Sequence, residues 1–159
     1  MNKISRTSIL LHWVAAVLIF LSVALAKQKE LDGLPLNAHT IIGVVLAVTM
    51  VIRLTFYIRN FTKKFLIANI VYSLLYIGIF FVLITGVWIA YQRNLIGYLL
   101  DPNSAFGRGN FKLLADIHKL GWQILLGWII LHIGTVSYRQ FLKKEAILER
   151  MWFTKNNQK

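Results

Sequence analysis

Four histidines are the residues whose type and position bear most directly on chemistry: His12, His39, His118 and His132. Each lies inside or at the edge of a long apolar stretch of the sequence. Because an ionisable side chain at membrane depth is costly to bury, it is a functional candidate by default. One such histidine is equally well explained by a hydrogen bond between helices. Four histidines whose depths match in pairs favour a bound cofactor instead.

The spacing of the last two histidines indicates the kind of cofactor. His132 follows His118 by fourteen residues, which is four whole turns at the roughly 3.5 residues per turn of a left-handed helical bundle. Both side chains then project from one helix face into the bundle interior, where bundles build cofactor sites. Two neutral imidazoles on opposite sides of a haem fill both axial positions of its iron, which suits electron transfer. Zinc typically needs four ligands around one ion, so two histidines per level favour haem.

Arg53 follows His39 by the same fourteen residues. We therefore predict that Arg53 lies on the same helix face as His39, about four turns further along, at the depth of His12 and His132. A buried arginine needs an anion, and a haem propionate accepts its two parallel N–H groups. The alternative is that Arg53 snorkels to lipid phosphates. Small residues that would let helices and porphyrin approach closely occur near these levels, namely Gly43, Gly86 and Gly134.

Four apolar segments must position these side chains: about 8–26, 37–58, 68–91 and 111–141. Each is long enough to cross a hydrocarbon core of roughly 30 Å, which takes about 20 helical residues. The connection over about 92–110 is the longest, and its Gly, Pro and Asn residues are turn signals. The expected fold is all-α, an integral membrane four-helix bundle that forms one domain over residues 1–159.

Alternating crossings place the histidines at two depths. The first helix enters from the side of the N-terminus, which puts His12 near that face. The second and fourth helices enter from the opposite side, so His39 and His118 lie near the opposite face. His132 is about 21 Å deeper than His118 at about 1.5 Å rise per residue, which is level with His12. We therefore predict two haems, an inner one between His12 and His132 and an outer one between His39 and His118.

Composition supports a membrane protein. The hydrophobic fraction is 57% and the charged fraction 15%, whereas soluble domains average about 25% charged residues. A net charge of +12 would indicate nucleic-acid binding in a soluble protein. Here the basic residues lie between apolar segments, so we expect membrane lipids as partners and no nucleic acid. The chain has no cysteine, which excludes disulfides, iron–sulfur clusters and covalently attached haem.

Lysine and arginine residues predict the orientation, because positively charged flanks stay in the cytoplasm. Twelve of the 18 lie before the first segment, near the second connection, or at the end of the fourth segment and beyond it. Both termini are therefore expected in the cytoplasm. The first segment also resembles a signal peptide, with Lys3 and Arg6 before it and Ala24-Leu25-Ala26 at its end. Its apolar stretch exceeds the roughly 7–15 residues usual for such peptides, so we expect it to be retained.

Several motifs lie along nearly the whole chain: Ser5-Arg6 with Leu11-His12-Trp13, His39 with Gly43 and Arg53, Gly86 with Tyr91-Gln92-Arg93-Asn94, Ile117-His118, Leu131-His132, and Phe141-Leu142-Lys143-Lys144 through Arg150-Met151. Together they resemble the bacterial cytochrome b561 family. The resemblance implies two b-type haems, each with two histidine ligands, in the inner membrane of a bacterium. It also implies electron exchange with the ubiquinone pool.

The resemblance implies two roles. The best characterised relatives are superoxide oxidases, which pass an electron from superoxide outside the membrane to quinone. Others are membrane subunits that connect a partner dehydrogenase or hydrogenase to quinone. We expect a superoxide:quinone oxidoreductase and keep the partner-dependent role as the alternative, because a fold does not determine a function.

Basic residues on the outer side are placed to steer a small anion such as superoxide. They are Arg93, Lys112 and Lys119, with Lys27, Lys29 and Arg108 in the same outer regions. Solvation of the loops or pairing with propionates of the outer haem explains them equally well.

A quinone site is not assigned from the sequence. Aromatic candidates are Tyr72, Tyr76, Trp88, Tyr91, Trp122 and Trp128, but Tyr and Trp commonly form the interfacial belt of membrane proteins. A histidine-based metal transporter would need polar residues through the midplane. The centres of the four segments are almost wholly apolar, so this third class is disfavoured.

Overall fold

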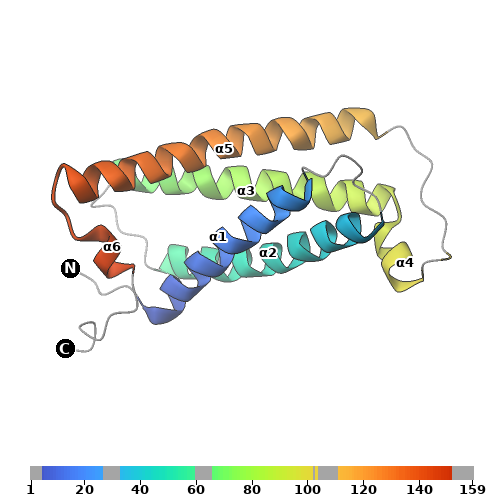
Figure 1. Ribbon diagram of the computed structural model, residues 1–159, viewed down its shortest axis with the longest axis horizontal. Helices are drawn as coiled ribbons and strands as arrows, with labels where there is room; N and C mark the ends of the chain where they lie inside the picture. The colour runs from blue at the N-terminus through green and yellow to red at the C-terminus, as the bar shows by residue number, and fades with distance from the viewer. Residues whose placement is uncertain (1–4, 27–32, 60–65, 102, 104–110, 152–159) are drawn as a thin grey trace.

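The computed structural model describes residues 5–26, 33–59, 66–101, 103 and 111–151. Four long helices cross the molecule: α1 (Arg6–Ala26), α2 (Gly33–Arg59), α3 (Leu66–Gln92) and α5 (Lys112–Phe141). All four have the length and hydropathy of membrane spans. The four predicted segments are therefore confirmed, and the described part of the chain is all-α (Figure 1).

The sequence pattern does not predict two short helices. Helix α4 (Leu95–Leu100) lies within the expected long loop, and α6 (Ile147–Arg150) follows α5. Asn94, with φ 55°, takes a left-handed conformation directly before α4, which lets the chain leave α3 and turn into the next helix. The Gln140 side-chain oxygen accepts the first two backbone N–H groups of α6 at 2.9 and 3.0 Å. The Ile147 N–H also donates to the Glu145 carbonyl at 2.7 Å, and the Leu148 N–H is one of the donors at a helix start that have no acceptor within the helix.

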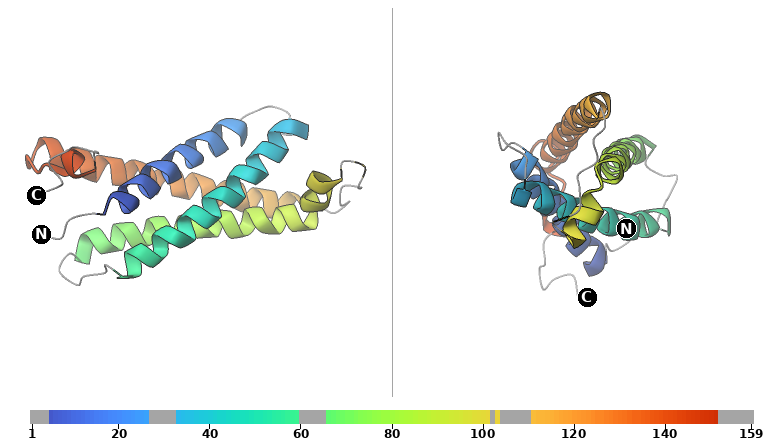
Figure 2. Two further views of the ribbon diagram at one scale, coloured as in Figure 1. Left: turned by 90° about the horizontal axis from the view of Figure 1, so that it is seen from below. Right: turned by 90° about the vertical axis from the view of Figure 1, so that its right-hand side faces the viewer.

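The long helices form two pairs. Helix α1 packs along α2, and α3 packs along α5, while α2 meets α3 over a shorter stretch (Figures 1 and 2). Because the helices alternate in direction, the start of α1 and the end of α5 lie together, beside α6 (Figure 1). We call this the terminal end of the bundle, and the opposite end, where α4 lies, the loop end. At the terminal end, the Trp13 indole donates a hydrogen bond to the Met151 carbonyl at 3.0 Å.

Glycine lets α3 and α5 approach each other closely. A Cβ on Gly121 of α5 would lie 2.6 Å from Cε1 of Phe81 in α3. A Cβ on Gly78 of α3 would lie 3.2 Å from Cδ1 of Leu125 in α5. Both distances are shorter than ordinary van der Waals contact, so larger residues would push the helices apart. Small residues are the usual means of helix packing in membranes, where lipid removes the hydrophobic driving force.

The middle of the bundle is apolar. Buried residues from all four long helices form one cluster there: Ala15, Leu46, Met50, Ile79, Leu83 and Leu125. Outside, large apolar side chains are exposed, among them Phe20 (66%), Ile77 (65%) and Ile130 (62%). Hydrocarbon is the solvent that matches this surface, and helices satisfy their own backbone hydrogen bonds within it. The chain is a multi-pass membrane protein.

Candidate functional site

Side chains from the four long helices converge toward the terminal end. The imidazoles of His12 in α1 and His132 in α5 have ring centroids 6.4 Å apart, with ring planes inclined by 64°. Arg53 of α2 donates from Nη1 to Nδ1 of His12 at 3.0 Å. Tyr72 of α3 places its ring 5.8 Å from the ring of His132. All four long helices therefore contribute to this terminal-end level.

A second level lies toward the loop end. His39 of α2 and His118 of α5 interact electrostatically across the bundle. Nδ1 of His39 lies 3.0 Å from the backbone carbonyl oxygen of Ser22 and 3.2 Å from its hydroxyl. The His118 imidazole hydrogen-bonds the Val82 carbonyl, and its Nδ1 lies 2.9 Å from Oγ1 of Thr85. Since a carbonyl oxygen only accepts hydrogen bonds, each of these imidazoles acts as a donor.

Three glycines near the two levels have different surroundings. A Cβ on Gly86, the residue after Thr85, would lie 3.1 Å from Cε1 of His118, so a larger residue would displace this imidazole. A Cβ on Gly43 or Gly134 would meet no atom within 4 Å. Helix packing therefore does not require glycine at these two positions, and the space beside each is open.

The terminal-end spacing fits two ligands of one haem iron. Metal–imidazole bonds are about 2.0 Å long, so two imidazoles that would hold one iron must lie close together. The His12 and His132 centroids are 6.4 Å apart. At the loop end, the hydrogen bonds of the histidines are those expected of iron ligands. A ligating histidine almost always donates its other N–H to an acceptor, as His39 and His118 do.

The described residues do not offer the ligand cluster of a zinc site. Among them, no three or more His, Cys, Asp or Glu side chains lie together in a way that could hold a metal ion. Structural zinc sites take four such ligands, and catalytic ones take three with a water. The donor set present, two imidazoles per level, is the one that a six-coordinate haem iron needs.

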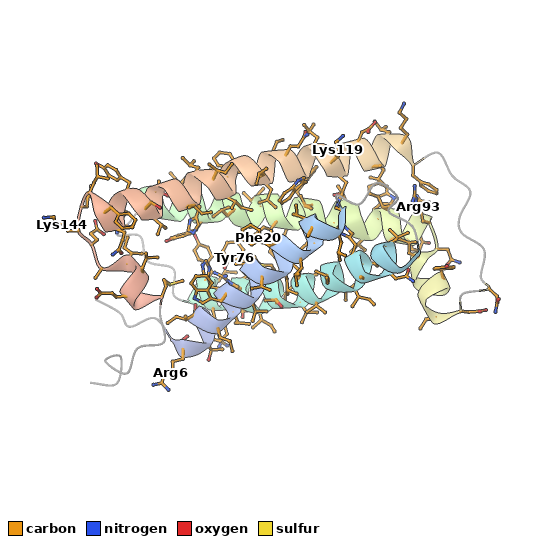
Figure 3. All side chains as sticks on the ribbon, in the orientation of Figure 1. Arg6, Phe20, Tyr76, Arg93, Lys119 and Lys144 are labelled. Carbon is orange, nitrogen blue, oxygen red and sulfur yellow. The ribbon has the colours of Figure 1, made fainter. Side chains whose placement is uncertain are left out.

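The three basic residues predicted to steer an anion occupy separate surfaces near the loop end. The Arg93 guanidinium lies 5.4 Å from the centroid of the Phe111 ring. Lys112, the first residue of α5, is exposed. Lys119 is also exposed and projects from the side of α5 that faces away from α1 and α2 (Figure 3). Three further predicted basic residues lie outside the described part of the chain: Lys27, Lys29 and Arg108.

Of the aromatic residues considered for quinone binding, two lie near the terminal-end level. Tyr72 contacts the ring of His132, and the Tyr76 ring lies 5.1 Å from that of Tyr57. The other aromatic candidates lie on α3 (Trp88 and Tyr91) and on α5 (Trp122 and Trp128).

Sequence reasoning did not identify the hydrogen-bond partners of the loop-end histidines. Hydroxyl groups within apolar helices often bond across a helix interface. A threonine inside an apolar segment, such as Thr85 beside Gly86, is therefore a candidate for such a bond. No spacing in the sequence links Thr85 to His118, however, because the two lie on helices whose relative rotation only the fold determines.

Comparison with known proteins gives one match. The family model described as prokaryotic cytochrome b561 matches residues 3–154. This range covers the four long helices, the four histidines and Arg53. No curated protein and no solved structure matches the chain.

Proposed function

Because the chain belongs to the prokaryotic cytochrome b561 family, which binds haem b and transfers electrons across membranes, we propose that it does so with two haems. The observation that carries the proposal is the arrangement of histidines in two levels. His12 and His132 face each other at the terminal end, with ring centroids 6.4 Å apart. His39 and His118 interact at the loop end.

Each histidine has one role in this proposal. His12 and His132 ligate one iron, and His39 and His118 ligate the other. When bound, haem b supplies a centre that gains and loses one electron. Two imidazoles would hold each haem iron, and the apolar cluster between the levels would keep water out of the electron path.

We assign Arg53 to a haem propionate at the terminal end. Its charge acts on both His12 and His132, and a cation at this depth requires an anionic partner. A guanidinium can bind a carboxylate through two parallel hydrogen bonds. The hydrogen bond from Arg53 to His12 supports this role over snorkelling, because it directs the guanidinium toward the bundle interior.

We place the terminal end in the cytoplasm of a bacterium and the loop end outside its inner membrane. Positive charge near membrane spans marks the cytoplasmic side. The described basic residues at the terminal end include Arg6, Arg59, Arg139, Lys143 and Lys144, and those near the loop end include Arg93, Lys112 and Lys119. Figure 3 shows Arg6 and Lys144 toward the first of these ends and Arg93 and Lys119 toward the other.

For the reaction, we propose superoxide as the outer donor and ubiquinone as the acceptor. Each superoxide loses one electron and becomes dioxygen. Two such electrons and two protons convert a quinone to its quinol, so two superoxides are consumed per quinone. The basic residues near the loop end support an anionic donor, because positive potential raises the local concentration of anions.

A second role is as the membrane subunit that connects a partner dehydrogenase to quinone. Exposed apolar side chains near the loop end favour it: Leu100 is 84% exposed and Leu113 is 73% exposed. A docked protein partner would cover such side chains.

Two measurements on the purified full-length chain test the proposal. The pyridine haemochrome assay should find two b haems per chain, and a single haem, or a metal without porphyrin, would overturn the two-level site. Haem-reduction spectra after addition of superoxide or of quinol then separate the roles. Reduction by superoxide supports the oxidase, and reduction by quinol alone supports the subunit role.

A further inference from the structure

The two histidine levels differ in the hydrogen bonding of Nδ1. From this difference we infer that the loop-end site binds haem before the terminal-end site. The hydrogen bond from Arg53 to His12 must break before His12 can bind iron, and we call this hydrogen bond the latch. The inference rests on the proposed haem ligation and adds an order of loading to it.

The loop-end histidines already carry their proton on Nδ1, which leaves Nε2 available to bind iron. A neutral imidazole carries one proton and ligates through its other nitrogen. Nδ1–H of His39 donates to the Ser22 carbonyl at 3.0 Å, so the lone pair is on Nε2. His118 donates to the Val82 carbonyl and has Thr85 Oγ1 at 2.9 Å. The Thr85 hydroxyl in turn lies 3.0 Å from two carbonyl oxygens of its own helix, which leaves its oxygen to accept from His118.

His12 is held in the opposite tautomer. A guanidinium has donors only, so the 3.0 Å contact from Arg53 Nη1 makes Nδ1 of His12 the acceptor. The single proton of the neutral ring is then on Nε2. Neither nitrogen of His12 has a lone pair available for iron. Ligation through Nε2 requires one proton to leave Nε2 and one to arrive at Nδ1, with no net change. Arg53 must also turn away, since two N–H groups would otherwise face each other.

A carboxylate is the group best suited to open this latch. It binds a guanidinium through two charge-assisted hydrogen bonds, which are about twice as strong as neutral ones. Arg53 therefore exchanges the imidazole for a propionate, and His12 is released to change tautomer. The loop-end level has no such step among the hydrogen bonds described above. Because the Arg53–His12 hydrogen bond must break before the propionate replaces it, it slows haem uptake at the terminal end by about tenfold or more, and the loop-end site fills first when haem is limiting.

Occupancy at limiting haem tests the order. The full-length chain is produced in cells with restricted haem supply and purified with less than its full complement. His12→Ala and His39→Ala variants provide reference spectra and midpoint potentials for the loop-end and terminal-end haem, respectively. The partly loaded wild-type protein should match His12→Ala, with at least about tenfold excess of the loop-end haem. A match to His39→Ala, or an equal mixture, would overturn the inference.

The tautomer of His12 gives a second readout, which does not depend on measuring how much haem each site holds. Nitrogen-15 spectra of histidine-labelled, partly loaded protein in its diamagnetic reduced state distinguish protonated Nδ1 from protonated Nε2. His12 should carry its proton on Nε2 in the wild-type protein. Arg53→Leu should abolish that preference, whereas Arg59→Leu, at the exposed end of the same helix, should preserve it. A wild-type His12 protonated on Nδ1 would overturn the latch.

Kinetics separate the latch from the propionate pairing. Haem uptake into the vacant terminal-end site of partly loaded Arg53→Leu should be about tenfold faster than in Arg59→Leu, while transfer of that haem to a soluble acceptor protein should also be faster. Faster uptake with unchanged release would retain the latch and overturn the propionate pairing. Unchanged uptake with faster release would retain the propionate pairing and overturn the latch. If neither rate changed, both the latch and the propionate pairing would be overturned.

Discussion

His12 and His132 are separated by 120 residues in the chain, yet their rings lie 6.4 Å apart, centre to centre. His39 contributes to the other level, nearer the loop end. We predict that His12→Ala removes or unbalances the terminal-end haem and largely spares the loop-end haem, and that His39→Ala does the reverse. Redox titration of the two haems measures the loss. Loss of the same haem in both variants would contradict the assignment of ligands.

Arg53 is the charged residue that borders both terminal-end histidines. Arg53→Leu should lower the midpoint potential of the terminal-end haem, because a nearby positive charge favours the reduced state. It should also weaken retention of that haem by about 2 kcal/mol, roughly thirtyfold, because a propionate would be left without its partner. Arg59→Leu is the matched control. A terminal-end haem unaltered in potential and retention would support snorkelling of Arg53 instead.

The sequence predicts the histidine levels better than the groups that orient the histidines. Depth follows from helix direction and rise per residue, which hydropathy and chain order supply. His39 donates to the backbone carbonyl of Ser22. His118 donates to the Thr85 hydroxyl and to the Val82 carbonyl. Carbonyl groups have no sequence signature, and the pairing depends on helix rotation. Ligation of iron by these histidines stays a prediction.

Close packing of α3 against α5 depends on Gly121, where an added Cβ would lie 2.6 Å from the Phe81 ring. A Cβ on Gly127 in the same helix meets nothing within 4 Å, so the two positions form a matched pair. Both Gly→Ala changes gain helix propensity, and only Gly121→Ala overpacks the interface. We expect Gly121→Ala to be less stable than Gly127→Ala by about 1–3 kcal/mol. Thermal denaturation in detergent measures this, and equal stabilities would show that Phe81 moves aside freely.

Hydropathy and length predict the four long helices because each must cross about 30 Å of hydrocarbon. The short helices α4 and α6 have no comparable signal. They form through local backbone geometry, such as the left-handed Asn94, and through side-chain bonds, such as that of Gln140 to the start of α6. Residues 102 and 104–110 of the expected loop over about 92–110 lie outside the described residues.

At the scale of the whole molecule, the proposed orientation is testable because the chain has no cysteine of its own. Ser5→Cys places a thiol at the terminal end, and Asn103→Cys places one near the loop end, both at exposed positions. In intact cells with a permeabilised outer membrane, a membrane-impermeant maleimide should label Asn103→Cys, and should label Ser5→Cys only after lysis. The reverse pattern would place the termini outside.

Electrostatic steering of superoxide is a property of the charge on one end of the molecule. Reversal to Glu at Arg93, Lys112 or Lys119 should slow haem reduction by superoxide, by about tenfold at a focused site, and leave reduction by quinol nearly unchanged. Lys144→Glu, at the opposite end (Figure 3), is the control. Stopped-flow rates should also fall as salt rises, since the screening length is roughly 10 Å at 0.1 M. Rates indifferent to salt and to charge reversal would contradict steering.

The apolar cluster at the middle of the bundle, which includes Leu46, Met50 and Leu83, has an electrical consequence. None of its six buried side chains can carry a proton, so in the proposed reaction an electron that passes between the two levels moves past them without a compensating charge. Such a transfer is electrogenic and experiences the membrane voltage, worth about 2.3 kcal/mol per elementary charge per 100 mV. With the cytoplasm negative, inward electron flow works against this voltage. An energised cell therefore opposes the proposed reaction, and a depolarised one favours it.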